Sequence, residues 1–122
     1  MAWLKGRFVY AYQGLKYGFC KDRSIRAHSF FSILVIVAGL FFRLTMVEWF
    51  WIALAIALVL SAEFFNSAIE KTVDYISLER NPLAGQIKDL CAAAVSIICI
   101  FAVIIGLSIF GPYLLNAFSK LF

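Results

Sequence analysis

The stretch EFFNSAIEKTVD, residues 63–74, directly follows an apolar run over residues 49–62. Four of its polar side chains fall within about 80° of one another, because each residue turns an α-helix by about 100°. These four residues, called the polar stripe below, are Glu63, Asn66, Glu70 and Asp74. A carboxylate at membrane depth costs roughly 2.5–3.5 kcal/mol and less near the interface. The polar stripe therefore needs partners, water or metal, and we interpret it as a functional site in or beside a bilayer.

The composition of the chain indicates a membrane protein. Hydrophobic residues make up 64% of its 122 residues, against roughly 45–50% in a typical soluble domain. A spanning helix needs about 20 mostly apolar residues. Residues 29–47 and 87–118 meet this requirement, as do residues 48–78 if the helix continues through the polar stripe. We therefore predict an all-α integral membrane protein with three transmembrane helices, in a single domain over residues 1–122.

The N-terminal segment has a different pattern from the three spans. Trp3, Phe8 and Phe19 recur near helical spacing, beside the basic Lys5 and Lys16. This pattern is typical of an amphipathic helix that lies in the membrane interface. We predict such a surface helix over residues 2–20.

The basic residues predict how the chain is oriented in the membrane. Six precede the first span and two lie between the second and third, whereas only Arg43 separates the first two and only Lys120 follows the third. By the positive-inside rule, the N-terminus faces the cytoplasm and the C-terminus faces outside. The polar stripe then lies at the cytoplasmic end of its helix, where a soluble nucleotide can reach it. The net charge of +4 suits anionic lipid next to the membrane, and we predict no nucleic-acid partner.

Residue chemistry alone leaves three interpretations of the polar stripe open. Its carboxylates could pair with Lys71, Lys88 and Arg80 and hold helices together. The polar stripe could instead conduct protons or cations through the membrane. It could also transfer a phosphoryl group to a lipid, because Glu63 and Glu70 lie about 10.5 Å apart along a helix. At that separation one carboxylate can act as a base while the other holds a metal-bound phosphate.

Other polar residues at the same depth suit phosphoryl transfer. Lys88 and Asp89 open the third span, and Asp22 lies just before the first. Lysine and carboxylate-bound Mg²⁺ are the usual partners of transferring phosphates. The chain has no Gly-rich Walker A motif, so a nucleotide site here would be of another kind.

The pattern E-x-x-N-S-A-I-E-x-x-x-D over residues 63–74 is followed after thirteen residues by the pair Lys88-Asp89. This arrangement resembles the signature of the small prokaryotic diacylglycerol kinase/undecaprenol kinase family, and the resemblance covers nearly the whole chain. It implies a homotrimer of three-span subunits in the plasma membrane of a bacterium. It also implies active sites that are shared between neighbouring subunits and open to the cytoplasm, with ATP as phosphoryl donor and Mg²⁺ as cofactor.

The same resemblance implies roles for individual residues. Glu63 matches the catalytic base and would meet the lipid, and Glu70 matches a carboxylate that binds the Mg²⁺ accompanying ATP. Asp22 stands where the family usually has a metal-binding Glu, so the side chain here is one methylene shorter. The residues matched to the nucleotide site are Tyr10, Asp22, Asn66, Glu70, Asp74, Glu79, Lys88 and Asp89.

The substrate is predicted from two short segments. IRAH at residues 25–28 and VEW at residues 47–49 look like the Gram-positive branch of the family, which resembles undecaprenol kinases. We expect His28 to be a hydrogen-bonding residue at the membrane interface, with no catalytic role. The predicted reaction is ATP-dependent phosphorylation of undecaprenol to undecaprenyl phosphate. A diacylglycerol kinase making phosphatidic acid is the alternative within the class, and a small proton- or cation-conducting protein is the alternative from another class.

Overall fold

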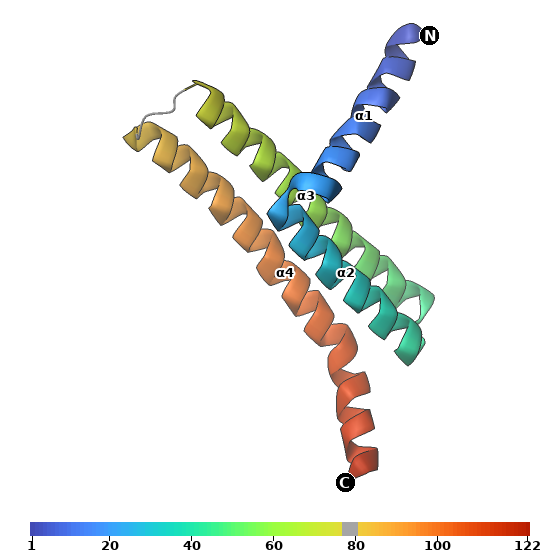
Figure 1. The fold of residues 1–122 in the computed structure, drawn as a ribbon. Coiled ribbons are helices and arrows are strands. Elements are labelled where there is room, and N and C mark those ends of the chain that lie inside the picture. Colours follow the sequence, from blue (N-terminus) through green and yellow to red (C-terminus); the bar gives the residue numbers. More distant parts are fainter. Residues whose placement is uncertain (77–80) are drawn as a thin grey trace.

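The computed structural model describes residues 1–76 and 81–122, which form four helices (Figure 1). The helices are α1 (Ala2–Lys21), α2 (Arg23–Phe42), α3 (Met46–Ile76) and α4 (Pro82–Leu121). The helices α2, α3 and α4 run side by side, and α1 projects away from them (Figure 1). Each of these three neighbouring helices is long and apolar enough to cross a membrane. This finding confirms the predicted all-α architecture with three spanning helices.

The helix ends follow local capping and not hydropathy alone. The predicted first span ran over residues 29–47, but α2 already begins at Arg23 and ends at Phe42. It ends there because Arg43 adopts the left-handed conformation, with φ 56°, and its N–H bonds to the carbonyl of Gly39. Pro82 likewise starts α4 before the predicted residue 87, since the side chain of Asn81 accepts from the N–H of Leu83 at 2.9 Å.

The turn between α2 and α3 is closed by a capping box. The N–H of Thr45 donates to Glu48 Oε1 at 2.9 Å, and the N–H of Glu48 donates to Thr45 Oγ1 at 3.3 Å. Next to this turn, Trp49 packs so closely on Gly39 that a Cβ there would lie 2.6 Å from the indole ring. On the other side, the hydroxyl of Tyr113 donates to Glu48 Oε1 at 2.7 Å, which ties α4 to the same turn.

The helix α1 is attached to the bundle through its C-terminal turns. Gly18 is buried against the ring of Phe64, and a side chain at this position would collide with that ring. Phe19 meets the same ring edge-on at 5.6 Å between centroids. Lys71 Nζ donates to the hydroxyl of Tyr17 at 2.7 Å. Gly18, which weakens the helix by intrinsic propensity, is therefore needed for close packing.

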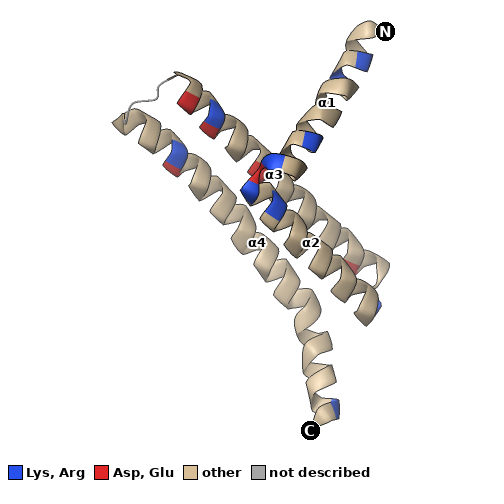
Figure 2. Ribbon diagram, viewed as in Figure 1, with Lys and Arg blue, Asp and Glu red and all other residues tan. Residues whose placement is uncertain are grey.

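The charged residues are concentrated at one end of the bundle (Figure 2). They lie on α1, on the first turns of α2, on the C-terminal part of α3 and near the start of α4 (Figure 2). The opposite end holds a hydrophobic cluster of buried residues, made of Leu44, Ile52, Ala55 and Ile105. Because the charges gather at one end, that polar end of the bundle is where a charged substrate can bind.

The α4 helix bends in its C-terminal part (Figure 1), which contains Pro112. A proline removes a backbone donor from the helix interior.

Candidate active site

Glu63 is the one charged side chain that the structure buries among the residues it describes, with 3% of its surface exposed. Its Oε2 accepts a hydrogen bond from Ser24 Oγ at 2.7 Å. Its Oε1 lies 2.9 Å from His28 Nε2, within reach of an N–H donor. Ser24 and His28 are four residues apart on α2 and so share one face of that helix. Each oxygen of this buried side chain therefore has a polar partner nearby, as burial of a polar group requires.

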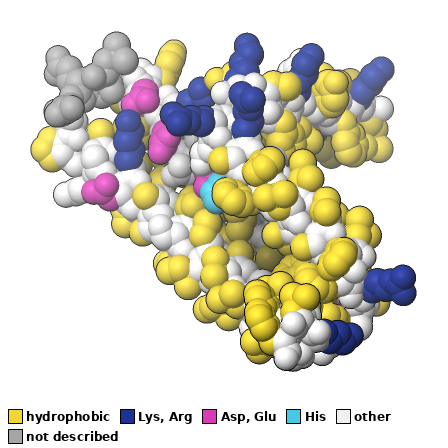
Figure 3. Space-filling model, turned by 60° about the horizontal axis from the view of Figure 1, so that its bottom comes forward, with side chains coloured by type: hydrophobic (Ala, Val, Ile, Leu, Met, Phe, Trp, Pro, Cys, Tyr) yellow, Lys and Arg dark blue, Asp and Glu magenta, His cyan; other side chains and the backbone are white. Residues whose placement is uncertain are grey.

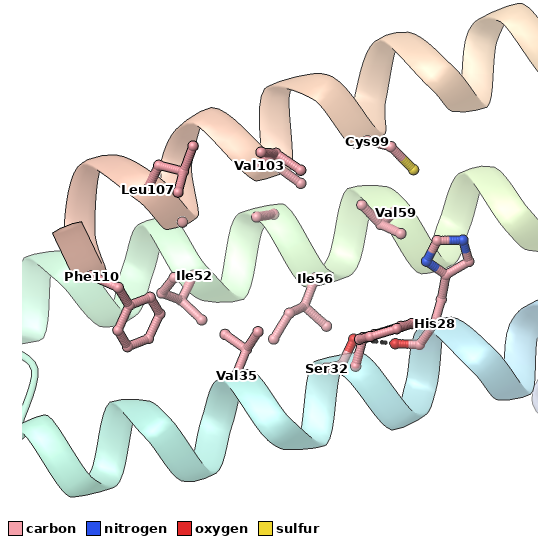
Figure 4. A pocket seen from close by; sticks show the side chains of 14 residues that line it. His28, Ser32, Val35, Ile52, Ile56, Val59, Cys99, Val103, Leu107 and Phe110 are labelled. Atoms are coloured by element: carbon pink, nitrogen blue, oxygen red, sulfur yellow. Dashed lines mark hydrogen bonds between the residues drawn. The ribbon is translucent and has the colours of Figure 1, made fainter. Parts of the chain in front are cut away.

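An apolar groove of about 470 Å³ lies between α2, α3 and α4, and His28, the neighbour of Glu63, is one of its lining residues. His28 stands at one end of the groove and Phe110 at the other (Figure 4). The space-filling view shows the chain's single histidine beside an acidic side chain, at the edge of a hollow lined by hydrophobic side chains (Figure 3). Between these ends the walls are formed mainly by Phe31, Val35, Ile52, Ala55, Ile56, Val59, Ala102, Val103 and Leu107.

The groove is polar only near its histidine end. Besides His28, its polar lining residues are Ser32 and Cys99. The hydroxyl of Ser32 donates to the backbone carbonyl of His28 at 2.8 Å and is therefore already engaged. An elongated apolar molecule with one hydroxyl end fits this distribution, with the hydroxyl next to Glu63 and the chain among the aliphatic side chains.

The middle of the polar stripe holds an unsatisfied acceptor. Asn66 Nδ2 donates to Glu70 Oε1 at 3.3 Å. Asn66 Oδ1 is buried and has no hydrogen-bond partner within the described part of the chain. An unpaired buried acceptor costs roughly 1–3 kcal/mol, so this oxygen is a candidate ligand atom. Amide and carboxylate oxygens are the ligands that Mg²⁺ takes from proteins, and the residues present fit that ion.

Asp22 joins the start of α2 to the middle of the polar stripe. Its Oδ1 caps α2 by accepting from the N–H of Ile25 at 3.0 Å, and its Oδ2 accepts from Ser67 Oγ at 2.6 Å. Burial raises the pKa of Asp22, but the hydrogen bonds from Ser67, Ile25 and Ser24 outweigh burial and leave this pKa below its usual value. The carboxyl group is therefore ionised at neutral pH.

Over residues 1–76 and 81–122, no three His, Cys, Asp or Glu side chains form a ready metal cluster.

The far end of the polar stripe contacts α4. Lys88 Nζ lies 2.8 Å from Asp74 Oδ1, in an exposed ion pair. Asp89 follows on the same helix and is exposed. Lys71 bonds to the hydroxyl of Tyr17 and to no stripe carboxylate. Among the described residues, a lysine pairs with Asp74, the last member of the polar stripe. The polar partner of Glu63 is instead His28, so pairing with lysine does not explain the position of Glu63.

For two of the predicted nucleotide contacts, Tyr10 and Glu79, the described part of the chain shows no contact with the polar stripe. Tyr10 lies on the part of α1 that projects from the bundle (Figure 1) and is 72% exposed. One chain does not bring it to the polar stripe. Glu79 lies outside the described residues. Both assignments stay predictions.

Comparison with known proteins identifies the family. The family model described as prokaryotic diacylglycerol kinase matches residues 9–110. The chain belongs to this family. An undecaprenol kinase of Bacillus subtilis (strain 168) is 37% identical to it over 107 residues, which is 88% of this chain and 87% of the relative.

Two diacylglycerol kinases are similar to the chain at nearly the same level. That of Synechocystis sp. is 36% identical over 110 residues, covering 89% of this chain and 63% of the relative. That of Haemophilus influenzae is 35% identical over 98 residues, covering 80% and 83%. These relatives confirm the resemblance found in the polar stripe, and the chain is a lipid kinase. Family membership favours phosphoryl transfer over the two other interpretations of the stripe.

In this lipid kinase, the partners of Glu63 were not predicted from the sequence. His28 was expected to be an interfacial hydrogen-bonding residue, and Ser24 was not singled out. The available signal was their spacing of four residues on the polar first turns of the first span. That spacing defines a shared face but does not identify the carboxylate which that face meets.

Proposed function

We propose that the chain phosphorylates undecaprenol, with ATP as phosphoryl donor, in the plasma membrane of a bacterium. The observation that carries the proposal is a buried carboxylate, Glu63, at the one polar end of an apolar groove between membrane-spanning helices. A polyprenol is a long apolar chain with a single terminal hydroxyl, and the groove has the same distribution of polarity. The relative named undecaprenol kinase supports this choice of substrate.

The proposed reaction begins with the lipid hydroxyl next to Glu63. Glu63 accepts the hydroxyl proton while the oxygen attacks the γ-phosphorus of ATP, the bond from that phosphorus to its bridging oxygen breaks, and ADP leaves. A positioned general base typically contributes a factor of about 10²–10⁴ in rate. Since the transition state of phosphoryl transfer is loose, most of the remaining catalysis comes from positioning and from neutralising charge on the phosphates.

Neutralisation of charge is assigned to the rest of the stripe and its neighbours. Glu70, Asn66 and Asp22 would hold Mg²⁺, which supplies positive charge at the phosphates when bound. The orphaned Asn66 Oδ1 beside Glu70 supports this set. Lys88 would neutralise further phosphate charge. The remaining nucleotide contacts proposed are Tyr10, Asp74, Glu79 and Asp89.

The proposed assembly is a homotrimer with shared active sites. Small residues at 91–94 of α4 allow close helix approach. The helix α1 projects from its own bundle (Figure 1), and such an arm can carry Tyr10 to the polar stripe of a neighbouring subunit. We further propose that α1 is an amphipathic surface helix on the cytoplasmic side and that the C-terminus faces outside, as the distribution of basic residues predicts.

Diacylglycerol is the second candidate substrate, because relatives at 35% and 36% identity carry the name diacylglycerol kinase. The test reconstitutes the purified protein in vesicles and supplies radiolabelled ATP with undecaprenol, with diacylglycerol or with neither. Labelled undecaprenyl phosphate formed faster than labelled phosphatidic acid is the expected result. Faster labelling of phosphatidic acid would favour the second candidate. Labelling of neither lipid, together with a proton or cation flux across the vesicles, would overturn both.

A further inference from the structure

A hydrogen bond from Ser24 and a close polar contact with His28 restrict the orientation of Glu63. One donor holds each carboxylate oxygen, at 2.7 Å from Ser24 Oγ and 2.9 Å from His28 Nε2. Both donors lie on consecutive turns of a regular helix, α2, which is a stiffer support than a loop. A carboxyl group held at both oxygens does not rotate freely about its last side-chain torsion.

The two donors approach Glu63 differently with respect to the groove. His28 lines the groove, whereas Ser24 is not among its lining residues. In Figure 4 the imidazole stands at the groove end nearest Val59 and Cys99. Because His28 lines the groove and Ser24 does not, we infer that Oε1, the oxygen next to His28, is the one nearer the groove. An ionised carboxyl oxygen has about two acceptor sites, so Oε1 keeps one for a second donor after His28 has used the first.

We propose that Ser24 and His28 are positioning residues that aim one free acceptor site of Glu63 Oε1 at the hydroxyl of the lipid in the groove. This inference rests on the proposed function of Glu63 as the base. His28 acts from the groove side and so also contacts the lipid end of the substrate. Ser24 does not line the groove and anchors the carboxyl group through its other oxygen, Oε2.

A donor role for His28 requires a particular form of the histidine. To donate to Glu63 Oε1, which lies 2.9 Å away, Nε2 must carry a proton, and in a neutral ring Nδ1 is then an acceptor. A side-chain amide at this position also presents an N–H donor at comparable reach, whereas an aliphatic side chain presents none. His28→Gln and His28→Leu therefore separate hydrogen-bond donation from filling of the groove end. The side chain of His28 is 31% exposed, so both replacements have room.

The test measures kcat and the KM values for lipid and for ATP in each variant. We expect His28→Leu to lower kcat by roughly 10–100-fold, taking as a guide the loss seen when a residue that orients a metal ligand is removed, and to raise the lipid KM. The KM for ATP should stay within about twofold. His28→Gln should recover most of the lost kcat. Ser24→Ala should lower kcat without changing either KM, and Ser24→Thr should restore it.

Ser29→Ala is the matched control. The hydroxyl of Ser29 lies on the same helix and donates only to the backbone carbonyl of Ile25, at 2.7 Å. Its removal should leave kcat and both KM values unchanged. If His28→Leu proves unable to fold, the Ser24→Ala and Ser24→Thr pair carries the test alone.

The positioning proposal is overturned if His28→Gln and His28→Leu have the same kcat. It is also overturned if the substitutions raise the KM for ATP and leave kcat unchanged. Wild-type enzyme assayed in parallel with undecaprenol and with diacylglycerol tests the proposed function separately. If diacylglycerol is the better acceptor, the variants are compared with that lipid and the same criteria apply. A wild-type enzyme that labels neither lipid overturns the base role of Glu63 and the positioning proposal together.

Discussion

The two ends of α3 each carry a glutamate, and the two side chains are used in different ways. Glu48 accepts from the N–H of Thr45 at 2.9 Å and from the hydroxyl of Tyr113 at 2.7 Å, at the turn between α2 and α3. Glu63 is buried, and its polar partners among the described residues, Ser24 and His28, both lie on α2. The first glutamate closes a turn and ties α4 to it. The second has no role in capping and lies next to His28, which lines the polar end of the groove.

Glu48 and Glu63 are the same residue type on the same helix, and they differ in their hydrogen-bonding partners. The partners therefore distinguish a structural carboxyl group from a functional one. A carboxyl group that satisfies backbone donors at a helix end stabilises the helix wherever it occurs. One that is buried away from any helix end needs another reason to be there. Each prediction below tests whether the two ends of α3 differ in this way.

The largest effect is expected from the two Glu→Gln replacements made side by side. Glu63→Gln keeps the size of the side chain but removes the base, and lipid phosphorylation should fall by about 10²–10⁴-fold. Glu48→Gln should leave turnover within about twofold of wild type and lower the thermal midpoint slightly, because an amide accepts more weakly than a carboxylate. Steady-state kinetics and thermal unfolding in detergent measure both. A Glu63→Gln enzyme with more than half of wild-type turnover would remove the distinction between the two ends.

The next effect concerns metal binding at the polar end. Glu70→Gln removes a charge that holds a hard cation, so the Mg²⁺ concentration for half-maximal activity should rise at least about tenfold. Added Mg²⁺ should partly rescue this variant and should not rescue Glu63→Gln. Asp22→Glu, which restores the family's usual side-chain length, should be tolerated. An enzyme whose Mg²⁺ dependence is unchanged by Glu70→Gln would contradict the assignment of that carboxylate.

A pair of glycines tests packing at the two ends. At Gly18 a Cβ would meet the ring of Phe64, next to Glu63, and at Gly39 it would meet the ring of Trp49 beside the capped turn. Overpacking of this kind typically costs about 1–3 kcal/mol, so Gly18→Ala and Gly39→Ala should both lower stability. Only Gly18→Ala should also lower kcat, since it shifts a neighbour of Glu63. Gly14→Ala, which meets open space, is the control and should be neutral or stabilising.

The smallest effect is a dependence of stability on pH that arises at Asp22. The pKa of Asp22 is lowered in the folded protein from its ordinary value of 3.8. Its contribution to stability is therefore present above that ordinary value and is lost as the pH falls through the lower folded value. The thermal midpoint of wild type should fall further than that of Asp22→Asn on acidification below about pH 4. Identical acid profiles for the two proteins would show that this carboxyl group makes no such contribution.

The chemistry of the site was predictable where it follows from helical periodicity. The polar stripe, its family and the lipid kinase activity could all be inferred from residues 63–74 and the Lys88-Asp89 pair. Helix ends were predicted less well, because hydropathy continues through residues 43–47 while Arg43 and the Thr45–Glu48 capping box end one helix and start the next. The T-x-x-E pattern of that box was present in the sequence as a signal.

Composition and spacing along one chain are enough to predict three spanning helices and a row of polar side chains on one of them. The packing of the helices is needed to find that Glu63 meets Ser24, 39 positions earlier in the chain, and that His28 lies between Glu63 and the groove. Periodicity defines which residues share a face of a helix. Which face of another helix these residues meet depends on how α2 packs on α3. That packing depends on the close contact between Gly39 and Trp49 and on the turn that joins the two helices.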